Sequence, residues 1–191
     1  MNIAPLKEQC LSRYDELACE YGTIFNSAKW ISLFGNKINP IGIFYDNDEL
    51  IGGFHLYTEK KFGLTICRNA PFTPHCGPFL KVVAKNPVAI RDNWKKALSL
   101  MARYIESLSL PVVSISLDNH IIDTQPFFWR KFKVIPCYTY LIDLSLPVDA
   151  ILKNMSPEKR NDIKKGESSG INVDICTDYK IVQSLVNKSF S

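Results

Sequence analysis

The chain contains no run of about eighteen uninterrupted apolar residues, the length that a helix needs to cross the hydrocarbon core of a bilayer. Its N-terminal segment lacks the basic region followed by an apolar region that marks a secretory signal. No Cys-x-x-Cys pair occurs among the six cysteines, and recognised zinc spacings are absent. We therefore expect reduced cysteines that pack as small hydrophobic residues, no bound metal, no membrane span and a cytoplasmic location.

Internal repeats and low-complexity segments are also missing, so the 191 residues suit one domain with an appendage, or two very small domains. Hydrophobic residues make up 46% of the chain and aromatic residues 12%, enough to bury a substantial core. The formal net charge is +4, too small to indicate nucleic-acid binding from composition alone.

Apolar periodicity predicts an α/β fold over residues 1–150. A long helix between strands requires at least one crossover connection, which implies a mixed sheet flanked by helices. The pair Gly52-Gly53 predicts a bulge in the second strand. The predicted helices cover residues 6–21, 27–34, 86–108 and 124–132, and the predicted strands cover residues 40–45, 49–59, 62–67, 112–117 and 134–144.

The C-terminal part of the chain is predicted to form a connector followed by a strand and a helix. A short helix opens at Pro147, and a second helix has Ser156 as its N-cap and ends at Gly170. Residues 151–170 are therefore predicted to form a basic helical connector. Residues 171–191 are predicted to open an incomplete second domain, with a strand at 171–175 and an amphipathic helix at 179–190.

Three stretches carry a resemblance to a known family. They are S-A-K-W-I-S-L-F at 27–34, the pair I-G-I-F-Y-D-N-D-E-L-I-G-G-F at 41–54 and P-F-T-P-H-C-G-P-F-L at 71–80, and K-R-N-D-I-K-K-G-E-S-S-G-I-N-V at 159–173. The predicted element order resembles the N-acetyltransferase (GNAT) fold. The stretches resemble the Fem-type aminoacyltransferases and their FemAB-like relatives, which carry two such domains in tandem. The chain resembles only the first half of such a protein.

This resemblance implies transfer of an acyl or aminoacyl group to an amine, carried by an amine-bearing small molecule or a cell-wall (peptidoglycan) precursor. In acetyltransferases the pyrophosphate of coenzyme A sits on a Gly-rich turn, and this chain departs from that pattern. It offers Arg68 and then only Gly77 between prolines, which lack N–H donors. We therefore expect no acetyl-coenzyme A at this domain. The alternative is a non-catalytic binding or scaffold module that keeps the fold and lacks the donor site.

The loop at 71–80 holds the first candidate site residues, Thr73, His75 and Cys76. His75 could act as a base and Cys76 as a nucleophile. The alternative, which we favour, is a proline-stiffened loop that packs Phe72 and Phe79 into the core.

Two further groups of candidates lie at the end of one predicted strand and on another. Asp118, with His120 beside it at a strand end, could form an acid/base pair, or a turn in which Asp118 caps the next element. Tyr138 and Tyr140 could donate protons to a transferase reaction, or simply favour a strand.

The basic connector and the C-terminal segment predict contacts with partners. Lys159, Arg160, Lys164 and Lys165 could meet an anionic partner, including RNA because Fem-type relatives use aminoacyl-tRNA as donor. A solvated surface helix is the alternative. A homodimer through residues 171–191 is expected because that strand edge and helix face need a partner.

Overall fold

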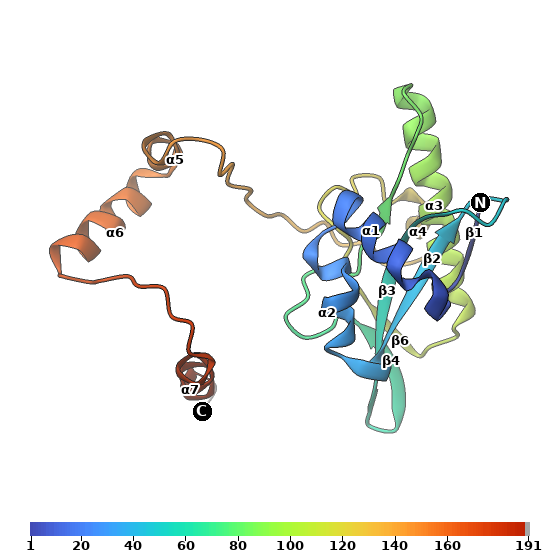
Figure 1. Ribbon diagram of the computed structural model, residues 1–191, viewed down its shortest axis with the longest axis horizontal. Coiled ribbons are helices and arrows are strands. Elements are labelled where there is room, and N and C mark those ends of the chain that lie inside the picture. Colours follow the sequence, from blue (N-terminus) through green and yellow to red (C-terminus); the bar gives the residue numbers. More distant parts are fainter. Residues whose placement is uncertain (190–191) are drawn as a thin grey trace. The chain divides into compact units, whose positions relative to one another are not determined.

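The structure is a computed structural model that describes residues 1–189, and the chain divides into two compact units, Met1–Cys137 and Tyr138–Ser191. Figure 1 shows the strands gathered in the first unit, while the helices α5, α6 and α7 belong to the second.

A six-stranded mixed sheet forms the centre of the first unit. The strands pair in the order β1-β2-β3-β4-β6, and β5 pairs with β3. Neighbours from β1 to β4 are antiparallel, whereas β6 is parallel to β4. The predicted α/β class, a mixed sheet flanked by helices, is confirmed. The strands are β1 (Asn2–Pro5), β2 (Ile38–Phe44), β3 (Leu50–Lys61), β4 (Leu64–Arg68), β5 (Phe79–Leu80) and β6 (Val112–Ser114).

Besides β2, strand β3 pairs with two further strands, each at a different part of its length. Residues Tyr57 to Lys61 pair with β4, while Gly52 and Gly53 pair with β5. Residues 69–78 leave the sheet between these two pairings and return to it. The chain therefore holds a loop against the middle of β3, and this loop carries the candidate site.

The predicted bulge is present next to Gly52. The register between β2 and β3 shifts between Ile43 and Phe44, so that Ile43 faces Gly52 and Phe44 faces Leu50. The extra residue, Ile51, is thereby turned to the same core as Phe54, although strict alternation would place it on the other face.

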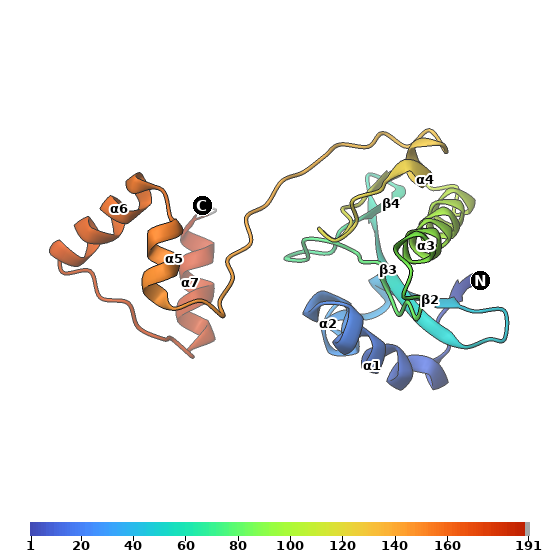
Figure 2. The ribbon, with the colours of Figure 1, turned by 90° about the horizontal axis from the view of Figure 1, so that it is seen from above.

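Helices cover both faces of the sheet, as Figure 2 shows for α1 and α2 on one side and α3 on the other. On the α1 side Tyr14 and Leu17 pack with Phe79. On the α3 side Leu98 and Met101 pack with Phe54. The helices are α1 (Leu11–Tyr21), α2 (Ala28–Ser32), α3 (Pro87–Ser107) and α4 (Gln125–Phe128), with 3-10 helices η1 (Glu8–Cys10), η2 (Ile24–Asn26) and η3 (Gly35–Lys37).

The helix starts follow from local sequence. The side chain of Asn86 accepts a hydrogen bond from the N–H of Val88, and Pro87 occupies the first turn of α3. Ser27 caps α2 in the same way through the N–H of Trp30. The α-helix begins later than predicted, because residues 8–10 form the 3-10 helix η1 ahead of it. Residues 2–5 form β1, a strand that the periodicity did not indicate.

The second unit contains α5 (Val148–Asn154), α6 (Pro157–Ser168) and α7 (Tyr179–Ser189). Ser156 caps α6 by accepting from the N–H of Lys159, as predicted. Gly170 follows α6 with a φ of 69°, a left-handed conformation that costs glycine little. The helix predicted at 179–190 is present to Ser189, and Phe190 lies outside the described residues.

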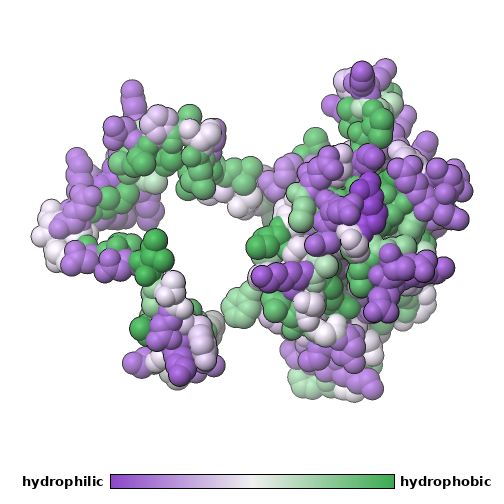
Figure 3. Space-filling model, viewed as in Figure 1, coloured by the Kyte–Doolittle hydropathy of each residue, from purple (hydrophilic) through white to green (hydrophobic). Residues whose placement is uncertain are grey.

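Two predicted strands are wrong. Residues 134–144 and 171–175 are irregular and pair with no strand in the part of the chain that the structure describes. Both segments are rich in β-branched and aromatic residues, but a strand also needs a neighbour for its backbone N–H and C=O groups. Figure 3 shows apolar side chains at the surface of α5 and of the segment before it, where Leu141 and Leu144 are exposed. Among residues 1–189, no helix is long and apolar enough to cross a membrane.

Candidate functional site

Backbone hydrogen bonds join the loop 69–78 to the segment that follows β6. The N–H of Cys76 donates to the carbonyl of Ser116 at 3.0 Å, and the N–H of Asp118 donates to the carbonyl of Gly77 at 3.0 Å. On the other side, the N–H of His55 on β3 donates to the carbonyl of Cys76 at 3.0 Å. These bonds bring Thr73, His75, Cys76 and Asp118, four of the predicted site residues, into one region.

Asp118 joins two histidines. Its Oδ2 lies 3.1 Å from Nε2 of His75, and its Oδ1 lies 2.5 Å from Nδ1 of His120. Burial opposes ionisation of this side chain, which is 7% exposed. Hydrogen bonds from the N–H and ring of His120, together with the electrostatic interaction of the carboxyl with both histidine rings, outweigh burial and hold the pKa of the carboxyl below its usual value. Asp118 is therefore a nearly buried carboxylate anion.

His75 is held as a neutral ring. The N–H of Gly77 donates to its Nδ1 at 3.2 Å, so this nitrogen is the acceptor. The proton then sits on Nε2, which lies within 3.2 Å of both Asp118 and the hydroxyl of Thr23. Burial lowers the pKa of His75, although the charge of Asp118 works against that shift. With both nitrogens engaged, His75 has no lone pair to accept a proton from a substrate.

His120 has the opposite arrangement. Its side chain is 77% exposed, and its Nδ1 faces the ionised Asp118. A carboxylate only accepts hydrogen bonds, so Nδ1 carries the proton and Nε2 keeps its lone pair. Asp118 thus orients His120 with the basic nitrogen free to meet a reacting group. The Asp-Asn-His sequence after the strand signalled this pair. The turn interpretation also applies, because Asp118 accepts from the N–H of His120 at 2.9 Å.

The loop is anchored by residues from the α1–α2 region that sequence reasoning missed. The indole N–H of Trp30 donates to Oγ1 of Thr73 at 3.0 Å, and that hydroxyl donates to the carbonyl of Pro71. Phe25 packs edge-on against the rings of both Trp30 and His75, with centroids 5.1 and 5.5 Å apart. Thr73 therefore fixes the loop, and no signal in the sequence links it to Trp30.

Cys76 is unsuited to nucleophilic chemistry. Its side chain is buried, and burial raises the pKa of the thiol to about 12, so the thiolate is scarce at neutral pH. The favoured interpretation of the loop is half correct. Phe79 is buried in the core as expected, but Phe72, whose backbone has a φ of 56°, is 86% exposed.

Several polar atoms are buried beneath the loop without a hydrogen-bond partner in the described part of the chain. They are the hydroxyl of Tyr14, Nδ2 of Asn26 and both ring nitrogens of His55. Burial lowers the pKa of His55 to about 4, with a smaller contribution from the charge of His75. His55 is therefore neutral at physiological pH.

The remaining predicted site residues belong to the second unit. Tyr138 and Tyr140 lie in its irregular first segment and are 93% and 98% exposed. On α6, Lys159 pairs with Asp162 at 3.4 Å, and Arg160 donates to the carbonyl of Lys153. Lys164 and Lys165 are exposed on the same helix.

Neither a metal centre nor a phosphate cradle is evident among residues 1–189. No group of three or more His, Cys, Asp and Glu side chains is placed to hold a metal ion. The segment 81–86 before α3 contains no glycine. The N–H of Val88 in the first turn of α3 is taken by Asn86, and Pro87 has no N–H.

No protein-family model matches the chain, and no curated protein matches it significantly. Solved structures of similar shape include a ribosomal-protein-alanine N-acetyltransferase from Brucella melitensis biovar Abortus, with 14% identity, a TM-score of 0.45, and 75% of this chain and 100% of that chain covered. An acetyltransferase from Trypanosoma brucei has 16% identity and a TM-score of 0.41, covering 75% and 99%. A transcriptional regulator from Bacillus halodurans has 9% identity and a TM-score of 0.42, covering 73% and 97%. At this level of similarity the likeness assigns no function to the chain.

Proposed function

We propose that the chain is a FemAB-like half of an N-acyltransferase or aminoacyltransferase, which transfers an acyl or aminoacyl group to an amine. The observation that carries the proposal is the pair of Asp118 and His120. A nearly buried carboxylate orients an exposed imidazole just beyond the end of β6. Amine acylation needs such a base, because the nitrogen of a neutral amine must lose one proton as its C–N bond to the acyl group forms.

We assign the proton transfers of this reaction to His120. Nε2 of His120 takes a proton from the acceptor amine, whose nitrogen attacks the carbonyl carbon of the acyl donor. A C–N bond forms, and the thioester or ester bond of the donor breaks. The imidazolium then returns the proton to the departing sulfur or oxygen. Asp118 stabilises the imidazolium while it carries the charge, and His75 holds the second oxygen of Asp118 in place.

The resemblance to Fem-type enzymes supports an acceptor that is a small amine or a peptidoglycan precursor. The donor is expected to differ from acetyl-coenzyme A. The segment 81–86 lacks the glycines that let a backbone approach a pyrophosphate, and Asn86 occupies the N–H of Val88. An aminoacyl ester is the donor class that fits both the resemblance and the missing cradle.

Mass spectrometry of reaction products tests the proposal. The chain is incubated with aminoacyl esters or with acetyl-coenzyme A, in each case with a set of amines that includes peptidoglycan-precursor peptides. We expect an acceptor whose mass rises by one acyl or aminoacyl unit in an ester reaction, and no saturable binding of acetyl-coenzyme A in calorimetry. Unchanged masses with every donor and acceptor would count against the proposal.

A second candidate function is a non-catalytic binding module with the same fold. The observation that favours it is the start of α3, where Pro87 has no N–H and the N–H of Val88 is bonded to Asn86. This module would bind an amine-bearing ligand without turning it over. Calorimetric binding of such an amine together with unchanged product masses would favour this candidate over the transferase.

A further inference from the structure

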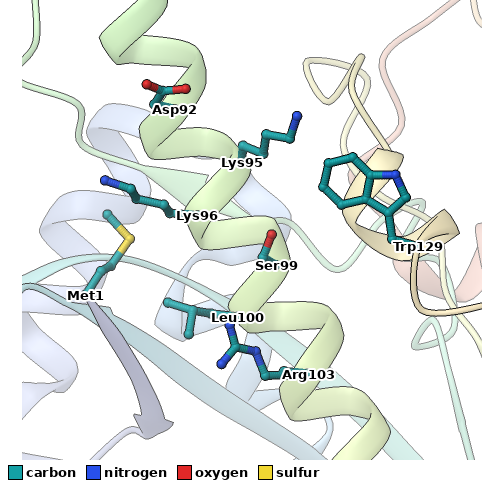
Figure 4. Close-up of a pocket in the computed structure, with 8 residues that line it drawn as sticks. All are labelled: Met1, Asp92, Lys95, Lys96, Ser99, Leu100, Arg103 and Trp129. Carbon is teal, nitrogen blue, oxygen red and sulfur yellow. The ribbon is translucent and has the colours of Figure 1, made fainter.

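A second surface of the first unit lies on the side of α3 that faces away from the sheet. It surrounds a hollow of about 680 Å³ whose floor is α3. Figure 4 shows Trp129 and Met1 on opposite sides of this helix, with Lys95 extending toward the indole ring. We call it the α3–α4 patch and define it by Lys95, Lys96, Arg103 and Trp129, which line the hollow, and by Phe128, which precedes Trp129 in the chain.

Two large aromatic side chains are left exposed here. The short helix α4 turns Phe127 into the core, where its ring meets Phe132 with centroids 5.6 Å apart. The next two residues point outward, and Phe128 is 69% and Trp129 60% exposed. Exposed apolar side chains that gather beside a hollow are candidates for an interaction surface.

The positive charges of Lys95, Lys96 and Arg103 have little neutralising negative charge beside them. Lys95 lies over the ring of Trp129, with Nζ 4.6 Å from the centroid, and donates to Gln125 at 3.1 Å. Lys96 and Arg103 have no hydrogen-bond or ion-pair partner within residues 1–189. The only carboxylate that lines the hollow in the described chain is Asp92. The patch is therefore positively charged as well as aromatic.

We propose that the α3–α4 patch binds the surface of a lipid bilayer that contains anionic lipids. Tryptophan and phenylalanine partition into the interface between headgroups and acyl chains, while lysine and arginine reach the anionic headgroups beside them. A nucleic-acid strand fits less well, because the ammonium group of Lys95 covers an indole face on which a base would stack. Leu100 and Met1 also make part of the lining apolar, as an acyl boundary requires.

Vesicle co-sedimentation of the full chain tests this proposal without any activity readout. Vesicles of phosphatidylglycerol mixed with phosphatidylcholine should bind the chain at low salt, and pure phosphatidylcholine vesicles should not. The double variant Lys96→Gln/Arg103→Gln should weaken binding about thirtyfold, because each cation near an anionic surface contributes a factor of about five and the two factors multiply. Trp129→Ala should also weaken binding.

A matched double variant serves as the control. Lys29→Gln/Lys60→Gln removes the same charge from exposed positions on α2 and β3, outside the patch, and should bind vesicles more tightly than the patch variant. Circular dichroism checks that all variants are folded. Equal binding by both double variants would overturn the proposal, because net charge alone would then act. Binding to an oligothymidylate but not to vesicles would overturn it too, and would assign the patch to nucleic acid.

Discussion

Replacing His55 with leucine should flatten the response of folding stability to acid. His55 is 1% exposed on β3, and neither ring nitrogen has a hydrogen-bond partner within the described residues. Burial lowers its pKa from 6.5 to about 4, since the charged ring loses its hydration without gaining a partner. The unfolded chain therefore binds a proton at this residue at a pH where the folded chain does not.

The sign and the size of the effect follow from linkage. This contribution to stability is fully present above pH 6.5 and is lost as the pH falls toward 4, because protons then favour the unfolded state. One pKa unit corresponds to about 1.4 kcal/mol, so the free energy of unfolding should fall by about 2.5 kcal/mol between pH 7.5 and pH 4.5 through His55 alone. His75, whose pKa burial also lowers, adds a loss of the same sign.

Urea unfolding at pH 7.5 and pH 4.5 measures this difference. The wild type should lose about 2.5 kcal/mol more than His55→Leu over that interval. At pH 7.5 the variant should be as stable as the wild type or more so, because leucine removes two buried polar atoms that have no partner. Lys29→Gln, at an exposed lysine on α2, should retain the wild-type loss. Equal losses in wild type and His55→Leu would refute the reasoning.

Two further predictions concern the sheet and the second unit. Gly53→Ala should lower the free energy of unfolding measured in urea by about 1–3 kcal/mol, because the added Cβ would lie 2.4 Å from Cε2 of Tyr14. Gly166→Ala on α6, where the nearest atom is 3.9 Å from the added Cβ, should instead stabilise the chain slightly. If Gly166→Ala destabilised the chain more than Gly53→Ala, the packing account would be refuted. The proposed homodimer now rests on the apolar face of α7, where Leu185 is 60% exposed, because the strand at 171–175 is absent. Light scattering should find a dimer for the full chain and a monomer after removal of residues 171–191, and a monomeric full chain at high concentration would disprove it.

Local signals in the sequence predicted much of the fold. Helix α3 followed from its Asn86-Pro87 start and its apolar face, and β3 followed from alternation beside Gly52-Gly53. Strand pairing was harder, because whether residues 134–144 form a strand depends on a neighbour that β propensity does not supply. β1 was missed because four residues are too few to show a period.

The candidate site was predicted in its parts but not in its roles. Sequence reasoning named His75 and Asp118 separately, since nothing in the sequence indicates that loop 69–78 folds back beside the end of β6. Only the hydrogen bond from Gly77 to Nδ1 of His75 shows that this histidine is held neutral. The same geometry leaves His120, the partner of Asp118, as the exposed base.

The most direct test of the central claim is the rate of acyl transfer by His120→Gln under single-turnover conditions. It is measured with the donor and acceptor that the wild type uses, beside Lys29→Gln as a folded control. If His120 is the general base, its replacement should slow transfer about 10²–10⁴-fold while Lys29→Gln keeps the wild-type rate. A His120→Gln variant that transfers the acyl group at the wild-type rate would contradict the account.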